Sequence, residues 1–172
     1  FTVSFLSLPK DQRDAMTAVY AFCREVDDDV DIPGPVAPAT LVAQWREEIA
    51  RTYEGKPSRP LTVCLWESIQ RFSLSREYFD GILTGVEMDL TRTRYATYES
   101  LQEYCYHVAG EVGLLCLEIF GYRSERLKNL YKCLLYKKRV ILFPPRSKLW
   151  GKFVVFIRIC IRLDFALQKE GF

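Results

Sequence analysis

Histidine is almost absent from this chain, since His107 is the only one among 172 residues. A single histidine has no partner for a His-based zinc site or a catalytic dyad, so we expect a spacer or hydrogen-bonding role within a helix. The six cysteines contain no Cys-x-x-Cys pair, which excludes the usual zinc and dithiol redox patterns. Cys23 and Cys105 fall on apolar helix faces, as expected of reduced core residues in a cytoplasmic protein.

Long apolar runs are also missing, and residues 1–122 show no strand periodicity, whereas residues 152–163 could form a strand or a helix. No stretch resembles a signal peptide. Residues 152–163 are rich in β-branched and aromatic side chains, but Lys152, Arg158 and Arg162 interrupt them, so the segment is too short and too charged to span a membrane. No alternating apolar pattern precedes residue 122. With 49% hydrophobic residues, the chain can still bury a core of one domain.

Helical periodicity dominates residues 1–122. Apolar side chains recur every three or four residues, and Pro and Gly punctuate the pattern. The predicted helices cover residues 9–31, 38–53, 60–72, a segment opening near 75 and extending to about 90, and residues 97–121. Short connections favour antiparallel neighbours, so the sequence predicts an all-α bundle.

Four aspartates occupy five positions at the end of the first predicted helix. At about 100° per residue, the apolar positions form one arc of that helix. An adjacent arc carries Tyr20, Arg24, Asp27, Asp28 and Asp31. A third arc, predicted to face solvent, carries Asp11, Asp14, Glu25 and Asp29.

The adjacent arc has the chemistry of a metal site, because like charges at this spacing repel and a cation would offset the repulsion. Mg²⁺ prefers oxygen ligands and often takes one or two carboxylates together with substrate phosphates. Arg24 lies one turn upstream of Asp28 and could pair with a phosphate group. The alternative is a merely solvated acidic face, and this motif alone leaves that alternative open.

Two longer motifs follow one another along residues 8–122. The first is Leu8-Pro-Lys-Asp-Gln-Arg-Asp-Ala-Met-Thr-Ala-Val-Tyr-Ala-Phe-Cys-Arg-Glu-Val-Asp-Asp-Asp-Val-Asp31. The second comprises Gly85-Val-Glu-Met-Asp-Leu90, Arg94-Tyr95, Tyr104-Cys-Tyr-His-Val-Ala-Gly-Glu-Val-Gly113 and Ile119-Phe-Gly-Tyr122. Together they resemble the squalene/phytoene synthase family over residues 1–122. The nearest subgroup is similar to bacterial presqualene diphosphate synthases of hopanoid biosynthesis, with phytoene synthases next.

The resemblance implies an isoprenoid-synthase helical bundle and a Mg²⁺-dependent head-to-head condensation of two prenyl diphosphates, such as farnesyl diphosphate to presqualene diphosphate. It assigns Asp27, Asp28 and Asp31 to Mg²⁺, Arg24 to the diphosphate, and Tyr20 and Asp89 to the cavity. The residues implied to line the prenyl channel are Tyr104, Val108, Ala109, Val112 and Gly113. NADPH would be needed only if a reductive step follows.

Simpler roles stand beside these assignments. Asp89 could be a surface charge paired with Arg92, and Tyr104 and Val108 would face inward in any helical bundle. Asp29 departs from the family pattern, which has an apolar residue at that position. The choice between a farnesyl and a geranylgeranyl substrate stays open.

Charge divides the chain in two. Residues 1–122 carry 11 Lys/Arg and 19 Asp/Glu, a net charge of −8, whereas residues 123–172 carry 13 and 3, a net charge of +10. The resemblance ends in this second region. It implies a further Asn-x-x-Arg-Asp-x-x-x-Asp motif, yet Asp164 is the only aspartate there. We therefore expect residues 123–172 to be a basic tail behind a truncated bundle, either read in a shifted frame or genuinely divergent.

Three functional hypotheses follow. The first is an active prenyl transferase. The second is a catalytically inactive fragment that retains only the first aspartate-rich half-site. The third is a helical interaction module whose basic tail binds a membrane or nucleic acid. We favour prenyl diphosphate substrates, no nucleic acid, and a cytoplasmic location that allows peripheral membrane association.

Overall fold

The computed structural model describes residues 8–32, 34–92, 94–122 and residue 129. Within these residues every regular element is helical, which confirms the predicted all-α fold. The elements are α2 (Lys10–Asp31), α3 (Pro38–Tyr53), α4 (Pro60–Phe72), α5 (Arg76–Thr91), α6 (Tyr98–Cys105), the π-helical turn η1 (Tyr106–Gly110) and α7 (Glu111–Phe120). The predictions made for residues 1–7 and for the basic tail lie outside this description, apart from residue 129.

Local sequence signals set the helix boundaries. Pro38 and Pro60 open α3 and α4, where their missing N–H groups cost no hydrogen bond. Ser73 ends α4 in the left-handed conformation, with φ of 53°. Thr97 caps α6 by accepting a hydrogen bond from the backbone N–H of Ser100 at 3.2 Å. These short-range features explain why the predicted boundaries agree closely with the observed ones.

The last predicted helix differs from the expectation in one respect. Residues 98–120 are helical throughout, but a π-helical turn interrupts the α-helix at Tyr106–Gly110. A π-turn accommodates an extra residue and shifts the faces of the helix that follow it. The interruption lies where the chain passes close to α5, because a Cβ added at Gly85 would be 2.8 Å from Val108 Cγ1 and 3.2 Å from the carbonyl carbon of His107.

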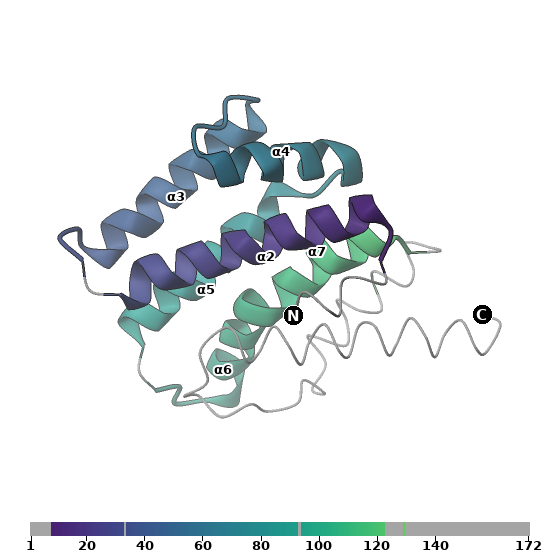
Figure 1. The fold of residues 1–172 in the computed structure, drawn as a ribbon. Helices are drawn as coiled ribbons and strands as arrows, with labels where there is room; N and C mark the ends of the chain where they lie inside the picture. The colour runs from purple at the N-terminus through teal and green to yellow at the C-terminus, as the bar shows by residue number, and fades with distance from the viewer. Residues whose placement is uncertain (1–7, 33, 93, 123–128, 130–172) are drawn as a thin grey trace.

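Helix α2 lies at the centre of the bundle and contacts α3, α4, α5 and α7 (Figure 1). Its apolar face forms the core with side chains from these neighbours. Phe22 packs edge-on against Trp45 and Phe79, with ring centroids 5.5 and 5.3 Å apart. All three rings are fully buried. A smaller cluster of Met88, Tyr104 and Val108 forms where α5 meets α6 and η1.

A buried carboxylate joins the end of α3 to the start of α4. Glu48 accepts hydrogen bonds from Ser58 N at 2.7 Å, Arg59 N at 3.2 Å and Thr62 Oγ1 at 2.6 Å, and also from the Ser58 hydroxyl. Burial alone would raise the pKa of Glu48, but these donors stabilise the ionised form and lower the pKa to about 2. The charge is therefore retained inside the fold.

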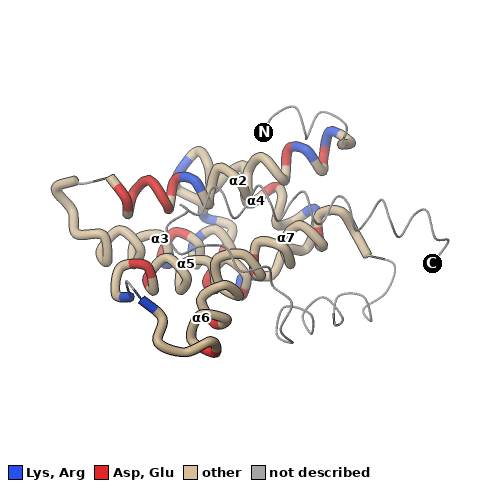
Figure 2. The backbone as a smooth tube through the Cα atoms, turned by 90° about the horizontal axis from the view of Figure 1, so that it is seen from below, with Lys and Arg blue, Asp and Glu red and all other residues tan. Residues whose placement is uncertain are grey.

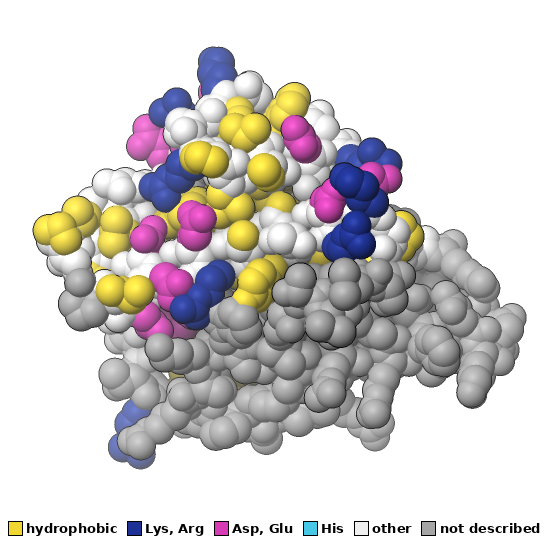
Figure 3. Space-filling model, viewed as in Figure 1, with side chains coloured by type: hydrophobic (Ala, Val, Ile, Leu, Met, Phe, Trp, Pro, Cys, Tyr) yellow, Lys and Arg dark blue, Asp and Glu magenta, His cyan; other side chains and the backbone are white. Residues whose placement is uncertain are grey.

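The surface of the described helices is chemically mixed. On the face shown in Figure 3, acidic, basic and apolar side chains are interspersed. Within the part of the chain that the structure describes, every helix falls short of the combined length and apolar character that a membrane span requires.

Candidate functional site

The acidic group lies at the C-terminal end of α2, as Figure 2 shows. The three aspartates assigned to the metal differ in environment. Asp27 is buried, with 9% of its surface exposed, Asp28 is half-buried and Asp31 is exposed. The group therefore reaches from the edge of the core to solvent, as the helical projection predicts, and it is not only a solvated face.

Asp27 carries the clearest electrostatic signature in the site. Its Oδ2 atom is buried and has no hydrogen-bond partner. Burial raises the pKa of Asp27 to about 6, and the charges of Asp31, Asp28 and Asp89 contribute to the increase, while Arg24 opposes it. Arg24 therefore compensates an ionised Asp27 only in part, and a cation at Oδ2 would supply the remaining compensation.

Arg24 and Tyr20 lie on the same face of α2, one and two turns before Asp28. Arg24 Nη2 is 2.7 Å from Asp28 Oδ1, and both side chains are a little over one third exposed. Burial raises the pKa of Tyr20, and the charge of Asp28 adds to this effect. The structure thus brings together the arginine, the tyrosine and the carboxylates that the sequence places on one arc.

Asp89 extends the site onto a second helix. It is exposed near the end of α5, and its charge is among those that raise the pKa of Asp27 on α2. Asp89 also accepts a hydrogen bond from the buried Tyr104 hydroxyl of α6. Arg92, the partner that the simple alternative gives to Asp89, pairs with Glu103 at 3.5 Å.

The five residues assigned to the prenyl channel divide between two environments. Tyr104 and Val108 are buried in the small cluster, and Ala109 packs against it. Val112 belongs to the main core, and Gly113 is buried in α7. The structure thus brings three of the five together beside Asp89. The assignment of all five to a channel remains a prediction.

Asp29 does not point to solvent as the helical projection predicts. It is half-buried, and its Oδ2 accepts a hydrogen bond of 2.8 Å from Trp45 Nε1 of α3. The prediction was wrong because a projection of one helix does not include the neighbour that packs on it. This bond accounts for a carboxylate at a position where the family pattern has an apolar residue, since a buried indole N–H needs an acceptor.

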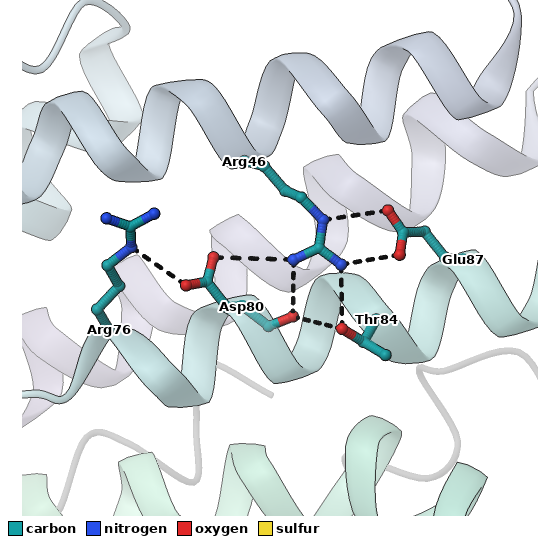
Figure 4. Close-up of polar contacts among 5 residues, drawn as sticks. All are labelled: Arg46, Arg76, Asp80, Thr84 and Glu87. Carbon is teal, nitrogen blue, oxygen red and sulfur yellow. Dashed lines mark hydrogen bonds and ion pairs between the residues drawn. The ribbon is translucent and has the colours of Figure 1, made fainter.

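Helix α5 is held in position by Arg46 of α3 (Figure 4). The guanidinium donates to both carboxylate oxygens of Glu87, at 3.1 and 2.8 Å, and to Thr84 Oγ1 at 3.0 Å. It also donates to the Asp80 carbonyl at 3.3 Å. Because bidentate pairs fix orientation as well as distance, this network sets the register of the helix that carries Asp89.

Some participants were not assigned from the sequence. Tyr95 occurs in the second motif but received no role, although its ring packs on Tyr104 with centroids 4.9 Å apart. Arg46 received none either. From the sequence alone, a cation on a helix face is predicted to be solvated, because its partners on another helix are not visible. Tyr95 could have been assigned to the site, since it stands within the second motif.

The residues present fit a metal ion that is shared with a ligand. Among residues 8–32, 34–92 and 94–122, no three His, Cys, Asp or Glu side chains converge to hold a metal by themselves. Mg²⁺ commonly binds through one or two carboxylates and completes its shell with water and phosphate oxygens. The unpartnered Oδ2 of Asp27 offers such a ligand.

Comparisons with known proteins identify the family. The Squalene/phytoene synthase family profile matches residues 1–133. The chain is 44% identical over 124 residues to the presqualene diphosphate synthase of Rhodopseudomonas palustris, covering 70% of this chain and 44% of that protein. It is 38% identical over 117 residues to the phytoene synthase of Arthrospira platensis, covering 66% of this chain and 37% of that enzyme.

The fold comparison gives the same result. The crystal structure of the squalene synthase HpnC from Alicyclobacillus acidocaldarius superposes with a TM-score of 0.70 at 29% sequence identity. The match covers 78% of this chain and 50% of that one. The chain thus spans half or less of the length of each of these relatives. By its sequence and its helical fold, the chain belongs to the squalene/phytoene synthase family of prenyl-diphosphate transferases.

Proposed function

We propose that the C-terminal end of α2 binds the diphosphate group of an allylic prenyl diphosphate together with Mg²⁺. The observation that carries this proposal is the buried, unpartnered Oδ2 of Asp27, surrounded by the charges of Asp28, Asp31 and Asp89. Carboxylates with strongly raised pKa values cluster at binding and catalytic sites. A cation would compensate the buried charge directly.

The chain's own residues have distinct parts in this proposal. Asp27 and Asp31 would hold the metal, which when bound supplies positive charge to stabilise the departing diphosphate. Arg24 would give a direct charge-assisted contact to a phosphate oxygen, and its pairing with Asp28 at 2.7 Å keeps the guanidinium on this face of α2. Tyr104 would orient Asp89 through their hydrogen bond.

For the whole protein we propose the head-to-head condensation of two prenyl diphosphates, with farnesyl diphosphate converted to presqualene diphosphate in hopanoid biosynthesis. The 44% identity to a presqualene diphosphate synthase supports this choice of substrate. The apolar cluster of Met88, Tyr104 and Val108 beside Asp89 would exclude water from the reacting chains. A reductive step with NADPH is not required for this product. A cytoplasmic enzyme in peripheral contact with a membrane suits a lipid substrate.

Titration calorimetry tests the binding step. The chain is titrated with farnesyl thiodiphosphate, an analogue that ionises poorly, with and without Mg²⁺. We expect binding that requires Mg²⁺ and that is lost in the double variant Asp27→Ala/Asp31→Ala. The matched control is Glu25→Gln, because Glu25 is an exposed acid on the same helix. Equal binding by the double variant would refute the assignment.

A further inference from the structure

Four buried side-chain atoms among the described residues have no hydrogen-bond partner, and one of them belongs to a tyrosine near the charge of Asp89. Tyr95 lies in the connection between α5 and α6, and its hydroxyl oxygen is buried with no hydrogen-bond partner. Its ring packs against Tyr104 with centroids 4.9 Å apart and an interplanar angle of 31°. Buried hydroxyls in proteins are nearly always hydrogen-bonded, so this exception needs an explanation.

The neighbouring carboxylate does not provide one. Asp89 accepts its hydrogen bond from Tyr104, although its charge also acts on Tyr95. Burial, together with the charge of Asp89, raises the pKa of Tyr95 to about 12. The Tyr95 hydroxyl therefore stays protonated at neutral pH and keeps one hydrogen to donate.

Two of these unpartnered atoms, one on Asp27 and one on Tyr95, are chemically complementary to a single ligand. Asp27 Oδ2 is an acceptor that lacks a cation, and the Tyr95 hydroxyl is a donor that lacks an acceptor. The charge of Asp89 acts on both residues. A diphosphate with its metal ion supplies both partners. The metal ion is the cation that Asp27 lacks, and the phosphate oxygens are strong acceptors for the Tyr95 hydroxyl.

We propose that Tyr95 donates its hydroxyl hydrogen to a phosphate oxygen of the prenyl diphosphate bound at α2. This role rests on the proposed function, and it adds a substrate-binding residue from the α5–α6 connection to those on α2. The Tyr95 hydroxyl would then bind the diphosphate directly. Its ring would hold Tyr104 in place, and Tyr104 in turn donates its hydrogen bond to Asp89.

The variant Tyr95→Phe separates this role from a structural one. It removes only the unpartnered hydroxyl, so the urea midpoint of the ligand-free chain should be unchanged or raised. Binding of Mg²⁺-farnesyl thiodiphosphate should weaken about ten-fold, as expected for a hydrogen bond to a charged group. Binding of Mg²⁺ with inorganic pyrophosphate should weaken equally, because the contact is made to phosphate and not to the prenyl chain.

Tyr98→Phe is the matched control, since Tyr98 is 40% exposed and lies three residues away; its affinity should equal that of the wild type. Tyr95→Phe binding within two-fold of wild type for both ligands overturns the proposal. A loss confined to farnesyl thiodiphosphate also overturns it, because it would place Tyr95 on the prenyl chain. If the wild-type chain binds neither ligand, the proposed function itself fails, and Tyr95 has no such role.

Discussion

Replacing Asp27 by asparagine should stabilise the ligand-free chain while removing its function. The carboxylate has a buried oxygen without a partner, and its pKa rises from 3.8 to about 6, first because of burial and then because of Asp31. At about 1.4 kcal/mol per pKa unit, the ionised form costs the native state roughly 3 kcal/mol at neutral pH. Asparagine removes the charge, but its buried amide also lacks a hydrogen-bond partner. This reduces the expected stabilisation by about 1 kcal/mol.

The expected net effect of Asp27→Asn is an increase of about 1–2 kcal/mol in the free energy of unfolding at pH 7.5. Because the native pKa is the higher one, the wild-type penalty is absent below pH 3.8, grows as the pH rises towards 6, and is complete above it. The gain should therefore nearly vanish at pH 4. Urea unfolding in metal-free buffer, followed by circular dichroism, measures both values.

Asp28→Asn is the control for this experiment. Asp28 is partly exposed and pairs with Arg24 at 2.7 Å, so its replacement should change stability by about 0–1 kcal/mol in the destabilising direction. If Asp27→Asn destabilises the chain at pH 7.5, or stabilises it equally at pH 4, the buried carboxylate is compensated inside the protein. A ligand would then not be needed to compensate Asp27.

Two further substitutions test the framework around the site. Glu48→Gln should lower the free energy of unfolding by about 2–3 kcal/mol at pH 7, whereas the exposed Glu47→Gln should change it by less than about 0.5 kcal/mol. The pKa of Glu48 is lowered from 4.5 to about 2, so its contribution to stability is complete above pH 4.5 and is lost as the pH falls towards 2. The free energies of unfolding of Glu48→Gln and Glu47→Gln should therefore converge in acid. Gly85→Ala should lower the free energy of unfolding by about 1–3 kcal/mol, because the new Cβ would lie 2.8 Å from Val108 Cγ1. Gly34→Ala should be close to neutral, because a Cβ there meets nothing within 4 Å. Thermal unfolding measures both variants, and equal midpoints would contradict close packing at Gly85.

The helices were predictable because their signals are local. The boundaries of α3 and α4 follow from Pro38 and Pro60 and from apolar side chains at helical spacing. The acidic face of α2 was also predictable, since a projection fixes which residues of one helix share a side. Both kinds of information lie within a few consecutive residues.

What the sequence does not reveal depends on contacts between helices. The hydrogen bond from Trp45 to Asp29 and the Arg46 network on α5 join residues 16 and 41 positions apart. The π-turn at Tyr106–Gly110 lies where the chain packs against Gly85, and no local pattern marks it. The sequence also cannot indicate that the Tyr95 hydroxyl lacks a partner, because this depends on which atoms bury it.

The central claim is that α2 holds a metal ion together with a diphosphate. Its most direct test is the water-proton relaxation rate of Mn²⁺, used in place of Mg²⁺, as the chain is added in the presence of farnesyl thiodiphosphate. Binding of the ion to the slowly tumbling protein raises this rate. We predict enhancement with the wild-type chain and with Glu25→Gln, and none with Asp27→Ala/Asp31→Ala. Equal enhancement in all three proteins would contradict the account.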